Sequence, residues 1–240
     1  MSGSQYIALS GLRARVDDLD RLATDIANVG TAGYKGERET RAVAERPRFD
    51  DALMTAIDTT FGGRGLDMTA GAMAATGRTL DVAIDGKGFF VVDNGSGPRY
   101  TRNGHFTLNN DRQLVTEEGD LVQGTSGPIT VGKGDVRIDS DGTVWADTEK
   151  AGQLAVVEFA DPRALVRDHG TTLRPPDGQI AVPVGTPIIR AGSLEASNVQ
   201  VSDRLAELTS VSRGFEALQK AISLLMNDVD GRAIEHLGRR

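Results

Sequence analysis

The last forty residues of the chain carry an apolar stripe with the period of an α-helix. Its members recur at steps of three and four, and they are Val201, Leu205, Leu208, Val211, Phe215, Leu218, Ile222, Leu225 and Val229. This spacing places the side chains on one helix face. Ser197 and Gln200 have the spacing of a capping box, so we expect a helix from Ser197 to about Leu237. A helix of roughly 40 residues is about 60 Å long, so part of its stripe needs other helices as partners.

The first thirty residues predict a second amphipathic helix. An alternating three-four spacing, typical of a coiled-coil seam, joins Leu9, Leu12, Val16, Leu19, Ala23 and Ile26, and Leu22 widens it. We expect this helix to run from Gln5 to Ala27 and to end near Asn28, because Gly30 and Gly33 offer positions for positive φ. Two seams at opposite ends of the chain predict that the termini pair with each other. The alternative, in which each helix packs on the middle of the chain, stays open at this point.

From Arg78 onward the apolar period changes to two. Leu80–Ile84 alternates, Gly86-Lys87-Gly88 makes a turn, and Phe89–Val92 forms the next strand. Glycine- and asparagine-rich turns then recur at short intervals, which is typical of antiparallel hairpins. Further strands are expected at 100–101, 106–108, 113–116, 129–131, 144–146, 154–159 and 186–191. The predicted class is α+β, with two terminal helices forming a coiled-coil-like pair and an antiparallel, sandwich or barrel-like β domain inserted between them.

These patterns divide the chain into four predicted parts. They are a first helix at 1–35, an irregular connector at 36–76, a β domain at 77–191 and a last helix at 192–240. The connector is helix-like only at Asp50–Asp58. Its glycine-rich end at Phe61–Gly65 lacks the spacing of a phosphate-binding loop, so we expect a flexible connector there.

Composition narrows the function classes. The 240 residues are 39% hydrophobic and 25% charged, which is typical of a folded globular protein. A net charge of −7 without a basic stripe argues against nucleic acid as a partner. The absence of cysteine excludes disulfides and thiolate chemistry. We find neither an apolar run of membrane-spanning length nor a cleavable Sec-type signal, so we expect no direct membrane insertion.

No arrangement of polar residues predicts a metal or cofactor site. The histidines His105, His169 and His236 lie far apart, without neighbouring ligand spacing. The run Asp139–Gly142 resembles the start of a calcium loop, but Lys150 occupies the position of the bidentate glutamate, so a hairpin turn is favoured. Gly86-x-Gly88 leads into a strand and therefore lacks the helix N-terminus of a dinucleotide site.

Catalytic residues are equally hard to find. A pair of facing carboxylates among Asp81, Asp85 and Glu158 stays possible, although structural roles near turns are favoured. Trp145 and Phe89-Phe90 are expected to fill the β core, whereas an exposed aromatic would mark a contact surface. We therefore predict no catalytic residue and no cofactor.

Four blocks of the sequence resemble the bacterial flagellar rod and hook proteins, in the family's order. They cover both ends and the start of the β domain: 26–35, 77–106, 192–199 and 213–216. This chain departs from the usual pattern at Gly30, Ala32 and Gly214. The residues that carry the resemblance are Asn28, Thr31, Gly33, Tyr34, Lys35, Leu80, Asp81, Gly86, Gly88, Phe89, Phe90, Ser197, Asn198, Val199, Arg213 and Glu216.

The resemblance implies a structural subunit of the flagellar basal-body rod, which transmits torque to the hook. It implies that copies of the chain and other rod proteins are its partners, and that the flagellar type III export apparatus carries it to the periplasmic part of the basal body. The expected assembly interface consists of Leu9, Leu12, Val16, Leu19, Leu22, Ile26, Leu205, Leu208, Phe215, Leu218, Ile222 and Leu225. The alternative from a different class is a secreted β-domain module that binds or cleaves glycans, with the helices as an oligomerisation stalk.

Overall fold

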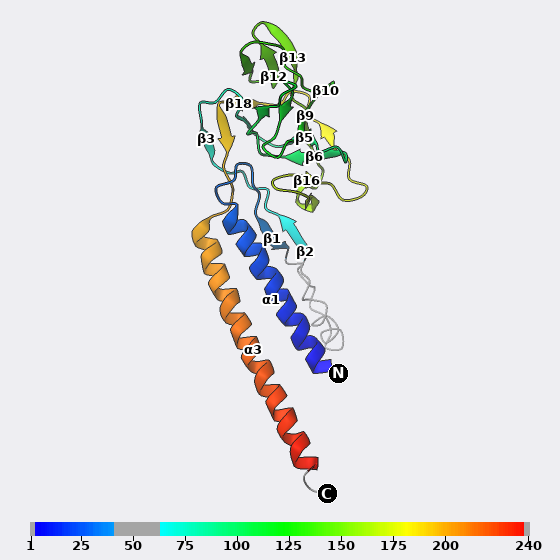
Figure 1. The fold of residues 1–240 in the computed structure, drawn as a ribbon, viewed down its shortest axis with the longest axis vertical. Helices are drawn as coiled ribbons and strands as arrows, with labels where there is room; N and C mark the ends of the chain where they lie inside the picture. The colour runs from blue at the N-terminus through cyan, green and yellow to red at the C-terminus, as the bar shows by residue number, and fades with distance from the viewer. Residues whose placement is uncertain (1–2, 41–62, 238–240) are drawn as a thin grey trace. The chain divides into compact units, whose positions relative to one another are not determined.

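The computed structural model describes residues 3–40 and 63–237 of the chain. These residues form two long helices with antiparallel strands between them in the sequence (Figure 1), which confirms the α+β class. The predicted helix-like stretch at Asp50–Asp58 lies outside the described residues. Contacts divide the chain into two compact units: the two helices belong to one, and residues 28–38 and 65–199 form the other.

The two helices are α1 (Gly3–Ala27) and α3 (Val201–Leu237). The predicted end of α1 at Ala27 is confirmed, and the helix begins at Gly3, two residues before the predicted start. The predicted start of the last helix at Ser197 is wrong by four residues, because the Ser197 hydroxyl accepts a hydrogen bond from the Val199 N–H within a local turn. The backbone N–H of Asn198 donates instead to the carbonyl of Tyr34, which holds this stretch outside the helix. The first intrahelical bond runs from the Arg204 N–H to the Gln200 carbonyl.

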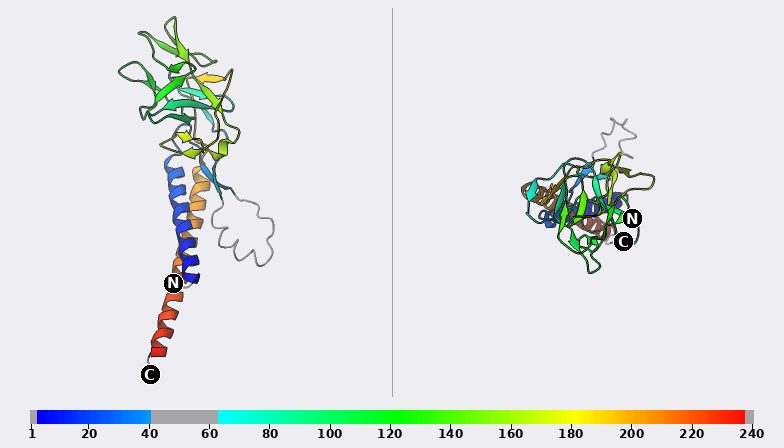
Figure 2. Two further views of the ribbon diagram at one scale, coloured as in Figure 1. Left: turned by 90° about the vertical axis from the view of Figure 1, so that its right-hand side faces the viewer. Right: turned by 90° about the horizontal axis from the view of Figure 1, so that it is seen from above.

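The helices lie side by side and run in opposite directions. Asp25, near the end of α1, contacts Arg204, near the start of α3, and Arg21 contacts Glu207 one turn further on. Figure 1 and the left view of Figure 2 show α1 along α3, and α3 continuing past the first turn of α1. The alternative in which each terminal helix packs only on the β domain is therefore wrong.

The β unit is built around one large antiparallel sheet, which has ten strands in the described part of the chain. Its strands are β5 (Phe89–Asp93), β6 (Pro98–Thr101), β7 (Thr107–Leu108), β8 (Leu114–Val115), β9 (Leu121–Gly124), β10 (Gly127–Pro128), β14 (Val156–Glu158), β15 (Val166–Arg167), β16 (Leu173–Arg174) and β17 (Val182–Pro183). β5 is central, because it pairs with β6 on one edge and with β9 and β14 on the other.

Smaller sheets complete the chain, and a short 3₁₀ helix, η1 (Pro162–Ala164), follows β14. The smaller sheets pair β1 (Glu37–Thr40) with β2 (Gly63–Leu66), β3 (Met73–Ala75) with β19 (Ser193–Glu195), β4 (Val82–Ile84) with β18 (Ile189–Ala191), and β11 (Val136–Ile138), β12 (Thr143–Ala146) and β13 (Glu149–Gln153) in sequence. The pairs β3–β19 and β4–β18 join the start of the β region to its end. The segments by which the chain enters and leaves this region are therefore paired with each other.

Two apolar clusters fill the β unit. The larger one includes Phe90, which stacks edge-on against Phe106 with ring centroids 5.3 Å apart. The smaller one includes Phe89 and Tyr100, both packed against Phe159. Burying a large aromatic side chain contributes on the order of 1.5–3 kcal/mol, so these rings account for much of the stability of the unit.

Two details of the predicted β domain are wrong. Trp145 is half-buried and belongs to neither cluster, because its neighbours Val144 and Ala146 take the inward positions of β12. Its indole N–H donates to Asp139 and its ring lies 5.3 Å from the Arg137 guanidinium. The strand expected at 129–131 forms a single bridge between Gln113 and Thr130, although Ile129 and Val131 are buried.

Candidate assembly site

The first part of the site is the terminal junction, which we define as residues 28–38, 65–71 and 195–199. It lies entirely within the β unit and joins the segment that follows α1 to the segment that precedes α3. The turn after α1 is closed by two hydrogen bonds from Thr31 to Asn28, one from the N–H at 3.1 Å and one from the hydroxyl at 3.2 Å.

Gly33 is the tightest point of this turn. Its φ is +68°, and a Cβ at this position would lie 2.2 Å from the backbone nitrogen of Asn103. Any other residue would therefore have to displace a strand end. Because the Gly33 N–H also donates to the carbonyl of Glu195 at 2.7 Å, the turn is fixed against the segment leading to α3.

A buried ion cluster lies at the centre of the junction. The Lys35 ammonium is 2.5 Å from Glu195 Oε1, and both side chains are almost fully buried. The same oxygen accepts the Gly71 N–H at 2.9 Å, while Lys35 also donates to the carbonyl of Thr69. Arg102 lies 3.5 Å from the other Glu195 oxygen and donates to the carbonyl of Gly86 at 2.6 Å.

Burial dominates the electrostatics of this cluster. It lowers the pKa of Lys35, and the hydrogen bond and negative charge of Glu195 oppose part of that change. A buried pair that loses one partner leaves an uncompensated charge, which typically costs about 3–5 kcal/mol. The cluster therefore ties Lys35, Glu195 and Arg102 into one unit, although they are distant in sequence.

Asn198 holds the junction together through its side-chain amide. Its oxygen accepts the Gly36 N–H at 2.8 Å, and its nitrogen donates to the carbonyl of Asp67 at 2.7 Å and to the backbone carbonyl and hydroxyl of Thr69, each at 3.2 Å. One side chain thus connects three chain segments. Both functional ends of an amide are needed, because one end accepts and the other donates.

Tyr34 and Val199 supply the apolar part of the junction, and both are buried. The Arg167 guanidinium lies 4.2 Å from the centre of the Tyr34 ring and donates to the carbonyl of Lys35 at 2.6 Å. A planar guanidinium is suited to this combination of ring stacking and hydrogen bonding.

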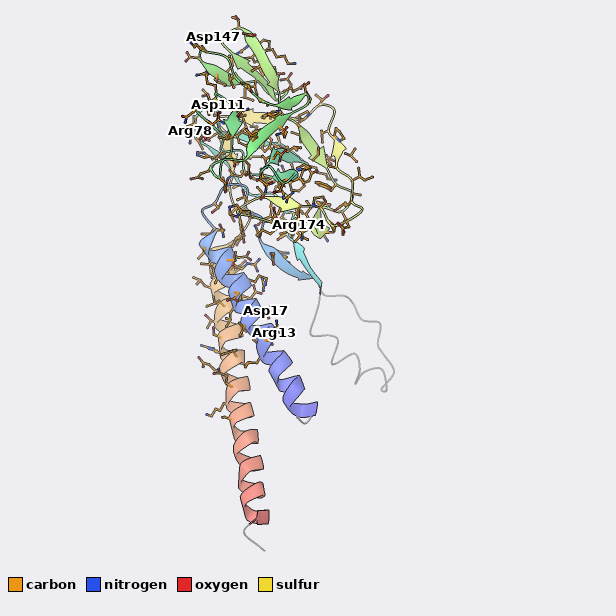
Figure 3. The ribbon with its side chains drawn as sticks, turned by 45° about the vertical axis from the view of Figure 1, so that its right-hand side comes forward. Arg13, Asp17, Arg78, Asp111, Asp147 and Arg174 are labelled. Atoms are coloured by element: carbon orange, nitrogen blue, oxygen red, sulfur yellow. The ribbon has the colours of Figure 1, made fainter. Side chains whose placement is uncertain are left out.

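The motif residues from Leu80 to Phe90 serve the fold of the β unit, although β4 and β5 pair with other strands and form no hairpin with each other. Asp81 is buried and lies 2.9 Å from His105, while Arg78, labelled in Figure 3, approaches it from the exposed side at 3.8 Å. A Cβ at Gly88 would lie 2.8 Å from a methyl group of Val156, so the turn between β4 and β5 needs glycine for close packing. Leu80 packs against the larger core cluster, which also contains Phe90, and Phe89 lies in the smaller one.

The second part of the site is the contact between α1 and α3. Its apolar centre consists of Leu22 and Val211, both buried. Around them lies an ion network: Arg21 contacts Glu207 at 2.8 Å, Arg204 contacts Glu207 at 2.8 Å, and Arg204 contacts Asp25 at 3.0 Å. Burial alone would raise the pKa of Glu207, but the hydrogen bonds from Arg21 and Arg204 outweigh it, and the pKa is lowered.

The apolar seam predicted on α1 does not form this contact. Leu12, Leu19 and Ile26 lie about a third of a turn around the helix from the buried positions Asp18 and Asp25, and they are half-buried. Val16 lies further round still and is 41% exposed. The predicted seam and the contact face of α1 are therefore different faces.

The same holds for the first turns of α3. Val201 and Leu205 are 39% and 48% exposed, and Leu208 is half-buried at the flank of the contact. On each helix, the apolar stripe is displaced from the contact face by a similar rotation in the direction of increasing residue number. Because the helices run in opposite directions, these two displacements place both stripes on the same side of the pair. We call Leu12, Val16, Leu19, Ile26, Val201, Leu205 and Leu208 the apolar side, whereas Phe215 is half-buried one turn after the buried Val211. Arg13 and Asp17, labelled in Figure 3, come from another side of α1.

The remaining predicted site residues are placed as follows. Arg213 and Glu216 are exposed on α3. Among the described residues, only the Arg15 side chain comes within 4.0 Å of where a Cβ of Gly214 would lie, so Gly214 marks a weak point of the helix and no close approach in this part of the chain. The side chains of Leu9, Leu218, Ile222 and Leu225 lie outside the described residues.

Sequence reasoning missed the ion networks of both parts. It gave no role to Arg204 or Glu207, although both contact α1 and the Arg204 side chain is only 14% exposed. It also gave no role to Arg102 or Arg167. The available signal was the spacing of Arg21 and Asp25 with Leu22, which places charged groups one turn apart beside an apolar residue.

The candidate carboxylates do not come together as a catalytic pair in the described structure. Asp81 is buried beside His105, Asp85 is paired with Arg190 at 2.6 Å on the surface, and Glu158 lines a different hollow. Among residues 3–40 and 63–237 no three potential ligand side chains gather as a metal site requires. Over the same residues, neither helix combines the length and apolarity needed to cross a bilayer.

Comparison with known proteins identifies the family. Residues 83–146 match the model of the flagellar hook protein FlgE/F/G D1 domain, and residues 190–224 match that of the flagellar basal body rod FlgEFG protein C-terminal region. The FlgG rod protein of Bacillus subtilis is 33% identical, over 93% of this chain and 95% of its own. The chain belongs to the flagellar basal-body rod protein family.

Two FlgF rod proteins match this rod-family chain along nearly its whole length. That of Caulobacter vibrioides is 31% identical over 100% of this chain and 99% of its own. That of Salmonella typhimurium is 30% identical over 97% of each. The resemblance read from the four motif blocks is confirmed, and with it a basal-body location and a structural role for the family.

Proposed function

We propose that the chain is a structural subunit of the proximal rod, of the F type. Its length near 240 residues, its single β unit and its opening Tyr6–Gly11 favour this type over the distal-rod G type. The lengths of the alignments with the relatives support the choice of the F type. The FlgF protein of Caulobacter vibrioides aligns over 247 positions with the whole chain, whereas the Bacillus subtilis FlgG alignment needs 264 positions for 93% of it.

The apolar side of the helix pair is the proposed assembly interface, with Leu22 as an internal contact. This is the observation that carries the proposal: Val16, Val201 and Leu205 remain exposed in a chain whose helices have already paired. Exposed apolar groups that line one side of a structure indicate a contact surface for other proteins. Copies of the chain and other rod proteins would cover it, each contributing its own terminal helices.

The two ion networks suit the transmission of torque. Within the helix pair, Arg204 contacts Asp25 and Glu207 contacts Arg21, which fixes the register of α1 against α3. Within the β unit, the junction fastens the two points where the chain enters and leaves it. A twisting load on one terminal segment would therefore be shared with the other, because Lys35, Glu195 and Asn198 connect both.

The proposed route and location follow from the family. The subunit would leave the cytoplasm through the flagellar type III export apparatus and reach the periplasmic part of the basal body. Its role is structural and not catalytic. The alternative of a glycan-binding or glycan-cleaving module has no support in the arrangement of the carboxylates.

The experiment tests the apolar side against a matched position on the same helix. Leu205→Asp places a charge on the apolar side, and Ser210→Asp places the same charge on an exposed position of another side of α3. Both residues are exposed, so both variants are expected to fold with unchanged helix content by circular dichroism. Leu205→Asp should abolish incorporation into basal bodies and swimming, and Ser210→Asp should leave both close to wild type.

Two outcomes would contradict the proposal. If Leu205→Asp chains were found in basal bodies at wild-type abundance, the apolar side would not be the interface. If both variants were missing from basal bodies to the same degree, the effect would come from the added charge alone. Val16→Asp, on α1, should repeat the result of Leu205→Asp.

A further inference from the structure

The β unit has a second apolar surface that the helices do not explain. Ile180, Val182 and Ile188 are 78%, 58% and 59% exposed, the highest values for large apolar side chains in the described part of the chain. They flank and belong to β17, which pairs only with β14 and so lies at an edge of the large sheet. Soluble chains rarely gather such exposed groups without a partner.

A hollow is lined by Pro183 of β17 and by residues that follow it in the chain. It has a volume of about 240 Å³, and Pro183, Val184, Gly185 and Pro187 form one wall, between Val182 and Ile188 in sequence. The other wall includes Thr125 and Leu154. A cavity of about 150 Å³ accommodates a benzene-sized apolar group, so this hollow has room for one branched aliphatic side chain.

Neither the exposed residues nor the hollow carries a charge. The run from Gly178 to Ile189 contains no acidic or basic residue, and none lines the hollow. The whole chain has a net charge of −7, so two copies repel each other over most of their surfaces. Two copies can approach each other at this neutral strip without bringing like charges together.

Strand addition is not the mode of contact that this edge favours. Pro183 has no N–H to donate, and proline in an edge strand interrupts pairing with a further strand. The complementary features are instead side chains and a hollow on the same molecule. Such a pair of features makes a contact that repeats from one copy to the next.

We infer that residues 178–188 form a contact between copies of this chain, in which an exposed aliphatic side chain of one copy enters the hollow of the next. The inference rests on the proposed function as a rod subunit and names a second surface for it, separate from the helices. The occupant is a second copy, because this chain carries both the exposed aliphatic side chains, which we call the knob, and the uncharged hollow. One copy can therefore supply the side chain that fills the hollow of another.

Disulfide cross-linking between engineered cysteines tests the contact. The chain contains no native cysteine that could form disulfides of its own. Purified Val182→Cys and Thr125→Cys chains are mixed under mild oxidation. A cysteine on the knob and one on the rim of the hollow would be held close, so at least about tenfold more mixed dimer is expected than from Ser96→Cys with Thr125→Cys. Ser96 is an exposed turn residue of the same unit. Adding Ile180→Asp to the Val182→Cys chain should reduce the yield to that of the control.

The result that overturns the inference is a mixed yield equal to the control, or an equal yield from Val182→Cys alone. The same oxidation on basal bodies that carry a Val182→Cys, Thr125→Cys double variant separates this inference from the proposed function. Chains present in rods but not cross-linked would overturn the contact and leave the function standing. Chains absent from rods that still form mixed dimers in solution would overturn the function and leave the contact standing.

Discussion

At the scale of single residues, the family motifs that lie in the β unit, between Asn28 and Val199, are explained by contacts inside that unit. Asn198 bonds to segments that lie 129 to 162 residues away in sequence, and Lys35 pairs with Glu195 across 160 residues. Such residues look ordinary in the sequence, since nothing in their local pattern reveals a distant partner. The resemblance placed them in motifs, and the structure supplies the physical reason.

Asn198 gives the sharpest test at this scale. Asn198→Ala removes the acceptor for the Gly36 N–H and the donor to the Asp67 carbonyl, and leaving such groups unsatisfied costs roughly 1–3 kcal/mol. We expect a lower midpoint of chemical denaturation for the β unit, followed by tryptophan fluorescence of Trp145. Asn94→Ala, in an exposed turn where Asn94 accepts one local hydrogen bond, is the control and should change the midpoint much less. Equal losses in the two variants would mean that the junction contributes no more than a surface turn.

At the scale of the elements, the helices and hairpins were predictable and their contact faces were not. The apolar periodicity predicted both helices, because the three-four spacing of an amphipathic helix does not depend on which partner its apolar face contacts. It chose the wrong face for the pair, because the contact is built from Arg21, Asp25, Arg204 and Glu207 around Leu22 and Val211, and charged residues are normally assigned to solvent.

The strands show the same limit. Where strong alternation and turn glycines coincide, as at Phe89–Asp93, the prediction is close. β9 and β13 were not predicted, since Leu121–Gly124 and Glu149–Gln153 contain few β-branched or aromatic residues and depend on pairing with β5 and β12.

The polar contact between α1 and α3 predicts an acid-sensitive helix pair. The folded chain lowers the pKa of Glu207, so the carboxylate stabilises the pair above its ordinary pKa, near 4.5, and this stabilisation is lost as the pH falls through the lowered value. We expect the difference in helix stability between wild type and Glu207→Gln, measured by thermal circular dichroism, to be present at pH 7 and to shrink between about pH 5 and pH 3. Arg21 and Arg204 face Glu207, and Asp25 shares Arg204. A difference that stays constant over this range would show that the Glu207 charge does not hold the pair.

At the scale of the whole molecule, apolar burial is concentrated in one of the two units. The two clusters of the β unit hold most of the buried apolar side chains of the described residues, whereas Leu22 and Val211 are the large buried ones in the helix pair. Since apolar burial is the main favourable term in folding, the helix pair of an isolated chain should open far more readily than the β unit. The apolar side would then be completed only by neighbours in the rod.

This asymmetry predicts the order of amide hydrogen exchange in the free chain. Peptides from α1 and α3 should exchange well before those from β5, β6 and β9, because local opening of a helix held by ion pairs costs less than opening of the central strands. Mass-spectrometric exchange on the purified monomer measures both sets in one experiment, and limited proteolysis should cut the helices first. Raising the salt concentration should speed exchange in the helices and leave the central strands unchanged, because exposed parts of the ion network are screened. Helices in the free monomer that exchange as slowly as β5 would mean that the pair is complete without neighbours, and the proposed assembly through its apolar side would lose its physical basis.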